Sequence, residues 1–207
     1  DILLGTQMIA KGLDFPRVTL VGVVNADTGM HLPDFRASER TFQLLTQVAG
    51  RAGRAEKEGR VLIQTFEVDH YAITCAIEHD FHKFVEQELA IREELFYPPF
   101  AHLALLRFEA EQESAAMKRA QEVADQLRDA VRAEQLGVLI LGPALAPLSR
   151  LKGIFRIQLL VKAEDRTTLR RALSPLSSVS QTGVRQILDV DPVSRKVGHS
   201  TDMNHKR

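Results

Sequence analysis

The sequence is organised around the stretch Gln47-Val48-Ala49-Gly50-Arg51-Ala52-Gly53-Arg54. An apolar series from Phe42 to Val48 leads into it at roughly helical spacing, which predicts a helix with one face in a core. Glycines at the end of that helix allow a tight turn and the close approach of another surface. We therefore expect Arg51 and Arg54 to project together from a single turn.

Two arginines presented in this way have a specific chemical use. A guanidinium is always charged, and its planar fork of donors matches phosphate oxygens. In phosphoryl transfer, an arginine from a second lobe can stabilise the charge that develops on the γ-phosphate. A basic surface turn that holds local salt bridges would have the same sequence, so the flanking residues must decide between the two interpretations.

The composition excludes several classes of protein. At 207 residues the chain can form one large or two small domains, and its 27 basic and 27 acidic residues create no overall field that attracts nucleic acid. The single cysteine, Cys75, lies among apolar residues and supports neither a disulfide framework nor a zinc site of its own. No apolar run approaches the ~20 residues of a membrane span. These features fit a protein of the reducing cytoplasm without a membrane partner.

The first 66 residues are predicted to form an α/β domain. Near-continuous apolar segments at 2–4, 18–24 and 61–66 indicate strands of a parallel sheet that is covered on both faces. A helical turn at 8–11, a polar loop over 25–40 and the Gln47 helix separate them. The chain opens inside an apolar run, which we interpret as a fragment whose upstream part is missing.

The second half has a different pattern. A helical connector over 67–97 ends at Tyr97-Pro98-Pro99-Phe100, where we place a domain boundary because a double proline forces an extended chain. The order that follows is β-α-β-β-α-β, as in ferredoxin-like α+β domains, over residues 98–192. Its expected elements are strands at 103–108, 138–141, 155–161 and 184–190, and helices at 113–134 and 165–173. Gly142-Pro143 is expected to end the second strand, and residues 193–207 are expected to be a disordered tail.

One stretch of this domain is locally basic. Seven basic residues and two acidic ones lie between Ser149 and Arg171. We expect Arg150 and Lys152 to lie in a loop after Pro147 and, with Arg156, to contact the phosphate chain of DNA. Phe155 could stack on a base, although its strand position favours the core. A solvated basic face would explain the same residues.

A second motif, Gly5 to Asp14, follows the first expected strand, at the edge where open α/β sheets place ligands. Thr6 could donate to a phosphate, and Lys11 is a compact cation that suits one. Asp14 could accept a ribose hydroxyl. Each of these residues is also common in turns and helix caps.

Taken together, the segments Gly5–Asp14 and Gln47–Arg54 resemble motifs V and VI of superfamily 2 helicases. The stretch Leu32–Leu45 is more particular and is similar to the primosomal protein N′ (PriA) family of replication-restart helicases. Other segments agree with this family, so the resemblance covers about residues 1–192: Tyr97–Phe100, Gly142–Ala144 and Leu188–Pro192.

The resemblance implies a partial RecA-like helicase lobe, followed by a DNA-binding domain, in an ATP-driven 3′-to-5′ DNA helicase that remodels stalled forks and starts primosome assembly. It implies DNA, single-stranded DNA-binding protein and replication-restart proteins as partners. It also implies roles for individual residues: Arg54 as the arginine finger with Arg51 beside it, Gln47, Asp14 and Gly12 at the nucleotide, and Thr6 and Lys11 at DNA or the lobe interface.

Some expected parts are missing from this sequence. It contains no G-x-x-x-x-G-K-[ST] loop to cradle phosphates and no acidic Walker B segment. ATP and Mg²⁺ would therefore be shared with an upstream lobe, and the family's zinc-binding cysteines also lie outside this chain. We expect this chain to hold half of a split active site and to bind no metal by itself.

Two alternatives belong to other classes. A non-catalytic module that docks DNA or protein would also lack a Walker loop. A nuclease or transferase finds no support, because the histidines show no metal-ligand spacing with acidic partners and fit surface or helix-cap positions better. They are His70, His79, His82 and His102.

Overall fold

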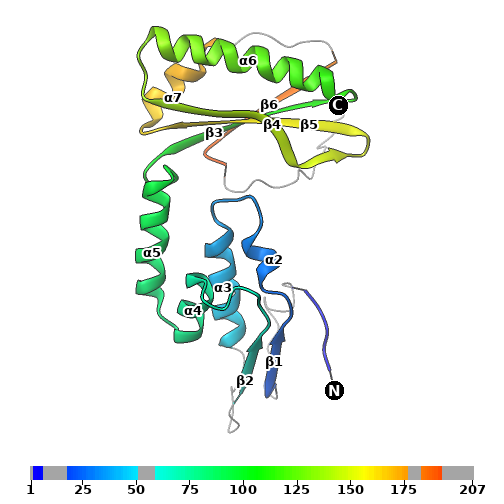
Figure 1. The fold of residues 1–207 in the computed structure, drawn as a ribbon, viewed down its shortest axis with the longest axis vertical. Helices are drawn as coiled ribbons and strands as arrows, with labels where there is room; N and C mark the ends of the chain where they lie inside the picture. Colours follow the sequence, from blue (N-terminus) through cyan, green and yellow to red (C-terminus); the bar gives the residue numbers. More distant parts are fainter. Residues whose placement is uncertain (1, 7–17, 51–58, 177–182, 193–207) are drawn as a thin grey trace, which may run out of the picture. The chain divides into compact units, whose positions relative to one another are not determined.

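The computed structural model describes residues 2–6, 18–50, 59–176 and 183–192. Contacts divide the chain into two compact units, residues 1–91 and 92–207. Each unit mixes helices with a sheet, and we describe each by itself (Figure 1).

The first unit contains the expected parallel pair of strands. Strand β1 (Leu20–Val23) pairs in parallel with β2 (Arg60–Ile63). Along both strands, half-buried and exposed side chains alternate. Within the described residues, the expectation of a sheet covered on both faces is therefore wrong, because one face of this pair remains accessible.

The expectation of a strand at residues 2–4 is also wrong. These residues form no strand, and Ile2 is 94% exposed. A strand needs a hydrogen-bonded neighbour, and in the described part of the chain β1 and β2 pair only with each other. The helical turn expected at 8–11 lies outside the described residues.

The region expected to be a polar loop contains two helices, α2 (Asp27–Met30) and the start of α3 (Ala37–Ala49). Asp27 is buried at the exit of β1. Its carboxylate accepts hydrogen bonds from the Thr65 hydroxyl, at 2.6 Å, and from the Phe66 backbone N–H. These bonds hold the segments after β1 and β2 together, and a loop prediction misses them because they join residues far apart in sequence.

The connector is helical, as expected, and forms two helices, α4 (Tyr71–Glu78) and α5 (Phe81–Glu94). His79 adopts a left-handed conformation that ends α4, and His70 caps its start by accepting from the Ala72 N–H. Helices α3, α4 and α5 share a core in which the buried Cys75 takes part, as predicted. Its buried members are Phe42, Leu45, Ala72, Ile73, Cys75, Ala76 and Phe84.

The second unit has the predicted order of elements. They are β3 (His102–Ala110), α6 (Glu113–Ala133), β4 (Val138–Leu151), β5 (Ile154–Ala163), α7 (Arg166–Leu173) and β6 (Arg185–Val190). A single 3-10 turn, Ser174–Leu176, follows α7. The strands form one sheet in the order β4-β5-β3-β6, and every neighbouring pair is antiparallel.

Both helices of this unit cover the same face of the sheet (Figure 1). The apolar residues of α6 are buried there with the even-numbered residues of β3. We call the opposite face the open face. It carries the odd-numbered residues 103–109 of β3 and those that the register places beside them, the even-numbered residues of β5 and the odd-numbered residues of β6.

Strand β4 does not end at Gly142-Pro143, as expected, but continues to Leu151 after two shifts of register. Gly142 makes this bulge possible with φ of +103°, and a Cβ at this position would lie 2.8 Å from the Gln158 carbonyl oxygen. Lys152 and Gly153 then form a two-residue turn in which both have positive φ, the geometry of a tight hairpin.

Candidate nucleotide and DNA interface

The helix before the two arginines is present. Phe42, Leu45 and Val48 are buried along one face of α3, whereas Gln47 is exposed in its last turn. Gly50 caps the helix, and its N–H donates to the Thr46 carbonyl at 3.1 Å. Arg51 and Arg54 lie outside the described residues, so their placement stays a prediction.

The Gly5–Asp14 motif is described only in part. Thr6 is exposed in a segment that is neither helix nor strand. Lys11, Gly12 and Asp14 lie outside the described residues. The structure therefore leaves the assignment of these four residues to nucleotide or DNA as a prediction.

Contrary to the expectation, the basic residues of the β4–β5 hairpin do not lie together in a loop. Arg150 lies in β4 and not in a loop, because Leu151 pairs with Ile154 and leaves only Lys152-Gly153 as the turn. Arg150 and Lys152 are exposed. The Arg150 guanidinium lies 4.8 Å from the centroid of the half-buried Phe155 ring, a cation–π arrangement. The hairpin therefore holds Arg150 on a paired strand and Lys152 in its two-residue turn.

The third predicted contact, Arg156, is buried on the open face with 8% of its surface exposed. Its Nε lies 3.3 Å from Oε1 of Glu109, the residue opposite it on β3. Arg107 Nε lies 3.1 Å from the same oxygen, and Arg185 Nη1 lies 4.0 Å from Oε2. We call these four residues the Glu109 cluster.

Arg107 and Arg185 were not predicted as site residues from the sequence. Each is one basic residue in an alternating strand, which is unremarkable by itself. Only the register shows that Arg156 and Arg185 stand directly opposite Glu109 on its two neighbouring strands. Spacing along a single chain carries no such information.

The remaining basic residues of the 149–171 stretch do not form one surface with the hairpin. Lys162 is only 3% exposed, and its Nζ donates to the Leu95 carbonyl at 2.9 Å above the Tyr97 ring. Arg166 is paired with Asp191 and Arg171 with Glu134. These basic residues are close in sequence, but each contacts a different part of the domain.

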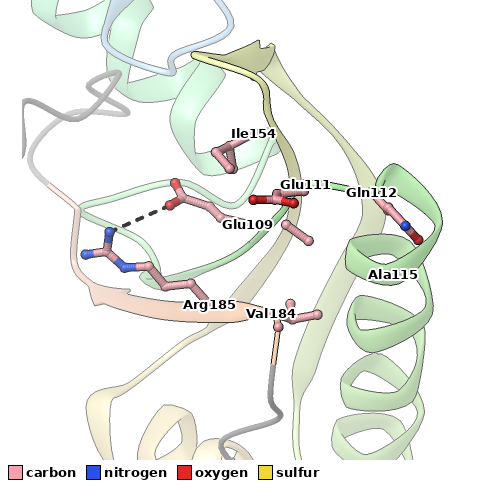
Figure 2. Close-up of a pocket in the computed structure, with 9 residues that line it drawn as sticks. Glu109, Glu111, Gln112, Ala115, Ile154, Val184 and Arg185 are labelled. Carbon is pink, nitrogen blue, oxygen red and sulfur yellow. Dashed lines mark ion pairs between the residues drawn. The ribbon is translucent and has the colours of Figure 1, made fainter.

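A hollow of about 860 Å³ lies beside the Glu109 cluster. Figure 2 shows Arg185 reaching from β6 toward Glu109, with Ile154 and Glu111 near the carboxylate and the start of α6 at the far side. The lining therefore combines acidic, basic and apolar side chains: Glu109, Ala110, Glu111, Gln112, Ala115, Ile154, Gly183, Val184 and Arg185.

The described residues contain neither a metal-binding cluster nor a membrane-spanning helix. No three His, Cys, Asp or Glu side chains gather there in a way that could hold a metal ion. None of the helices found there is long and apolar enough to cross a membrane.

Comparison with known proteins first defines the class of the second unit. Residues 93–193 match the family described as the primosomal protein N C-terminal domain. The match covers the sheet, both helices and the Glu109 cluster.

The particular relatives are replication restart proteins named PriA. The chain is 46% identical over 197 residues to the protein of Bacillus subtilis (strain 168). This alignment covers 93% of this chain and 24% of the relative. Identity is 44% with the proteins of Synechocystis and of Treponema pallidum, over 94% of this chain and 23% and 29% of those relatives. The chain thus spans about a quarter of their length, and the resemblance to the PriA family is confirmed.

Proposed function

We propose that this chain is the C-terminal part of an ATP-dependent 3′-to-5′ DNA helicase that recognises stalled replication forks and initiates primosome assembly. The observation that carries the proposal is the 46% identity to a replication restart protein over 197 residues, because that alignment extends through both units. By this proposal the first unit is part of a RecA-like lobe, and the parallel β1–β2 pair supports it. The second is ferredoxin-like, supported by its β-α-β-β-α-β order with both helices on one face.

The first unit would supply one side of an ATP site. Helix α3 is anchored by a buried core and capped by Gly50, so the position of the backbone at the end of the helix is fixed. Arg54 would contact the γ-phosphate there, with Arg51 beside it and with Gln47, Gly12 and Asp14 near the nucleotide. ATP would supply the driving reaction. Mg²⁺ and most of the phosphate contacts would be held by the upstream lobe, because this sequence has no Walker loop.

The second unit would hold DNA. Two exposed cations on a rigid hairpin, next to a partly accessible aromatic ring, combine the phosphate contacts and the stacking that single-strand binding uses. Thr6 and Lys11 would contact DNA from the first unit. Single-stranded DNA-binding protein and other restart proteins, acting at the bacterial nucleoid, are part of the same proposal.

The arginine finger gives the most specific test. In a protein that also contains the upstream lobe, Arg54→Ala should lower the kcat of DNA-dependent ATP hydrolysis by roughly 10³-fold or more and leave KM almost unchanged. The contact is made mainly in the transition state. Arg54→Lys should restore little activity, because a point charge lacks the planar fork.

The matched control is Arg132→Ala, since the Arg132 side chain is 79% exposed on α6 and its ion pair with Asp129 is long, at 3.9 Å. This variant should keep normal turnover. Near-normal turnover of Arg54→Ala would show that Arg54 is structural and would remove the split-site assignment.

A further inference from the structure

The Glu109 cluster has an unbalanced charge in a fixed position. Among the described residues, three arginines lie within ion-pair distance of this single carboxylate. They come from three adjacent strands of a sheet whose other face is packed against α6 and α7. Strand pairing therefore fixes the backbone position of each arginine. The four residues have a formal excess of two positive charges, and Glu111 in the adjoining hollow offsets one of them.

The carboxylate cannot satisfy the guanidinium donors around it. Three guanidinium groups carry about fifteen N–H donors, whereas a carboxylate offers roughly four acceptor sites. The imbalance appears at Arg107, whose buried Nε makes no hydrogen bond within the described part of the chain although it lies near Glu109. One carboxylate therefore leaves guanidinium donors without an acceptor in the protein, and a further oxyanion on the accessible side of Arg107 and Arg185 would supply acceptors for them.

The four side chains of the cluster differ in their exposure to solvent. The side chains of Arg156 and Glu109 are 9% and 11% exposed, that of Arg107 is 23% exposed and that of Arg185 is 70% exposed. Arg156 and Glu109 form a buried ion pair at the bottom of the cluster, and Arg107 and Arg185 are accessible to solvent on the open face. An anion can therefore approach without any change in the sheet.

We propose that the Glu109 cluster binds a phosphate of the backbone of single-stranded DNA. The choice of DNA rests on the proposed function, whereas the oxyanion follows from the cluster itself. Arg107 and Arg185 would contact the phosphate, and Arg156 would hold Glu109 in place. Glu109 would position the guanidinium groups and weaken anion binding through its own charge.

The location agrees with a second contact on the same strand of DNA. Arg156 follows Ile154 and Phe155 in β5, so the cluster lies two residue pairs from the Lys152-Gly153 turn. Strands in a sheet are about 4.8 Å apart and residues along them rise about 3.3 Å each. Arg150 stands opposite Phe155 on the face away from the cluster, so of the two hairpin cations only Lys152, in the turn, could contact a phosphate next to the one at the cluster.

The test measures binding of a fluorescent 20-nucleotide oligo(dT) to the 207-residue chain by anisotropy over a range of salt concentrations. Arg185→Gln and Arg107→Gln should each weaken binding and reduce the log–log salt slope by roughly 0.7, the value for one phosphate contact on a single strand. Glu109→Gln should do the opposite and tighten binding, by up to about fivefold at low salt, because it removes a repulsive charge.

The matched controls are Arg132→Gln and Glu134→Gln on the helical side of the domain, which make the same changes of charge. Glu134→Gln also releases an arginine, Arg171, from its ion pair. Both should bind almost as the unchanged chain does, and circular dichroism melting should verify that each variant is folded.

The outcomes separate this inference from the proposed function. If the unchanged chain binds oligo(dT) but Arg185→Gln binds equally well and Glu109→Gln no more tightly than Glu134→Gln, the cluster is structural and the inference is overturned. If the unchanged chain does not bind at all, the proposed DNA-binding role fails and the inference fails with it.

Discussion

At the scale of single residues, Asp27 shows how a buried carboxylate can fix the geometry of the first unit. It accepts a short hydrogen bond from the Thr65 hydroxyl and others from the backbone of Phe66. The hydrogen bond from Thr65 holds the pKa of Asp27 below its ordinary value. Since the pKa is lowered on folding, the ionised carboxylate stabilises the native state.

This predicts a specific pH dependence for Asp27→Asn. The contribution of Asp27 should be fully present above the unfolded pKa, about 4, and should be lost as the pH falls through the lower folded pKa. The variant should therefore unfold at a lower urea concentration than the unchanged chain at pH 7, and the gap should narrow below about pH 4. Asp129→Asn, an exposed control, should show no gap. A gap of constant size at every pH would contradict the assignment.

Some single residues could be interpreted from the sequence and others could not. Cys75 in the core and His70 and His79 at helix caps behave as their sequence contexts indicate. Arg107 and Arg185 could not be found, because their shared partner, Glu109, becomes visible only when three strands are placed in register.

At the scale of elements, the helices and the order of the second unit were predictable because they rest on local periodicity. The apolar spacing of α6 determines its buried face without knowledge of any partner. The continuation of β4 past Gly142-Pro143 was not predictable. A glycine and a proline normally end a strand, and here pairing with β5 resumes after the bulge.

Two glycines of the β4–β5 hairpin should respond differently to substitution by alanine. Gly153→Ala should cost about 1–2 kcal/mol, because φ of +85° is strained for an L-residue although the surrounding space is empty. Gly142→Ala should cost more, since its Cβ would also meet the Gln158 carbonyl. Gly137, with open space and no positive φ, is the control. Urea unfolding would measure the three, and equal losses at Gly142 and Gly153 would contradict this account of the bulge.

At the scale of the whole molecule, the chain consists of two units, each with its own core, which we propose to be part of a helicase lobe and a DNA-binding domain. Without a Walker loop in its sequence, the 207-residue chain should not hydrolyse ATP by itself, with or without DNA. A coupled assay for released phosphate would measure this. DNA-stimulated turnover by the purified chain would show that the ATP site is not divided between this chain and an upstream lobe.

The central claim for the second unit is that its hairpin binds the phosphate chain of DNA, and one measurement tests it most directly. The chain and its Arg150→Ala/Lys152→Ala variant are compared for binding of labelled oligo(dT) over a range of salt concentrations, with Lys118→Ala/Arg132→Ala on α6 as a control of equal charge. The hairpin variant should bind more weakly, and its log–log salt slope should fall by roughly 0.7 for each phosphate contact that is lost. The control should match the unchanged chain. Equal affinities and equal slopes for the hairpin variant and the unchanged chain would contradict the claim.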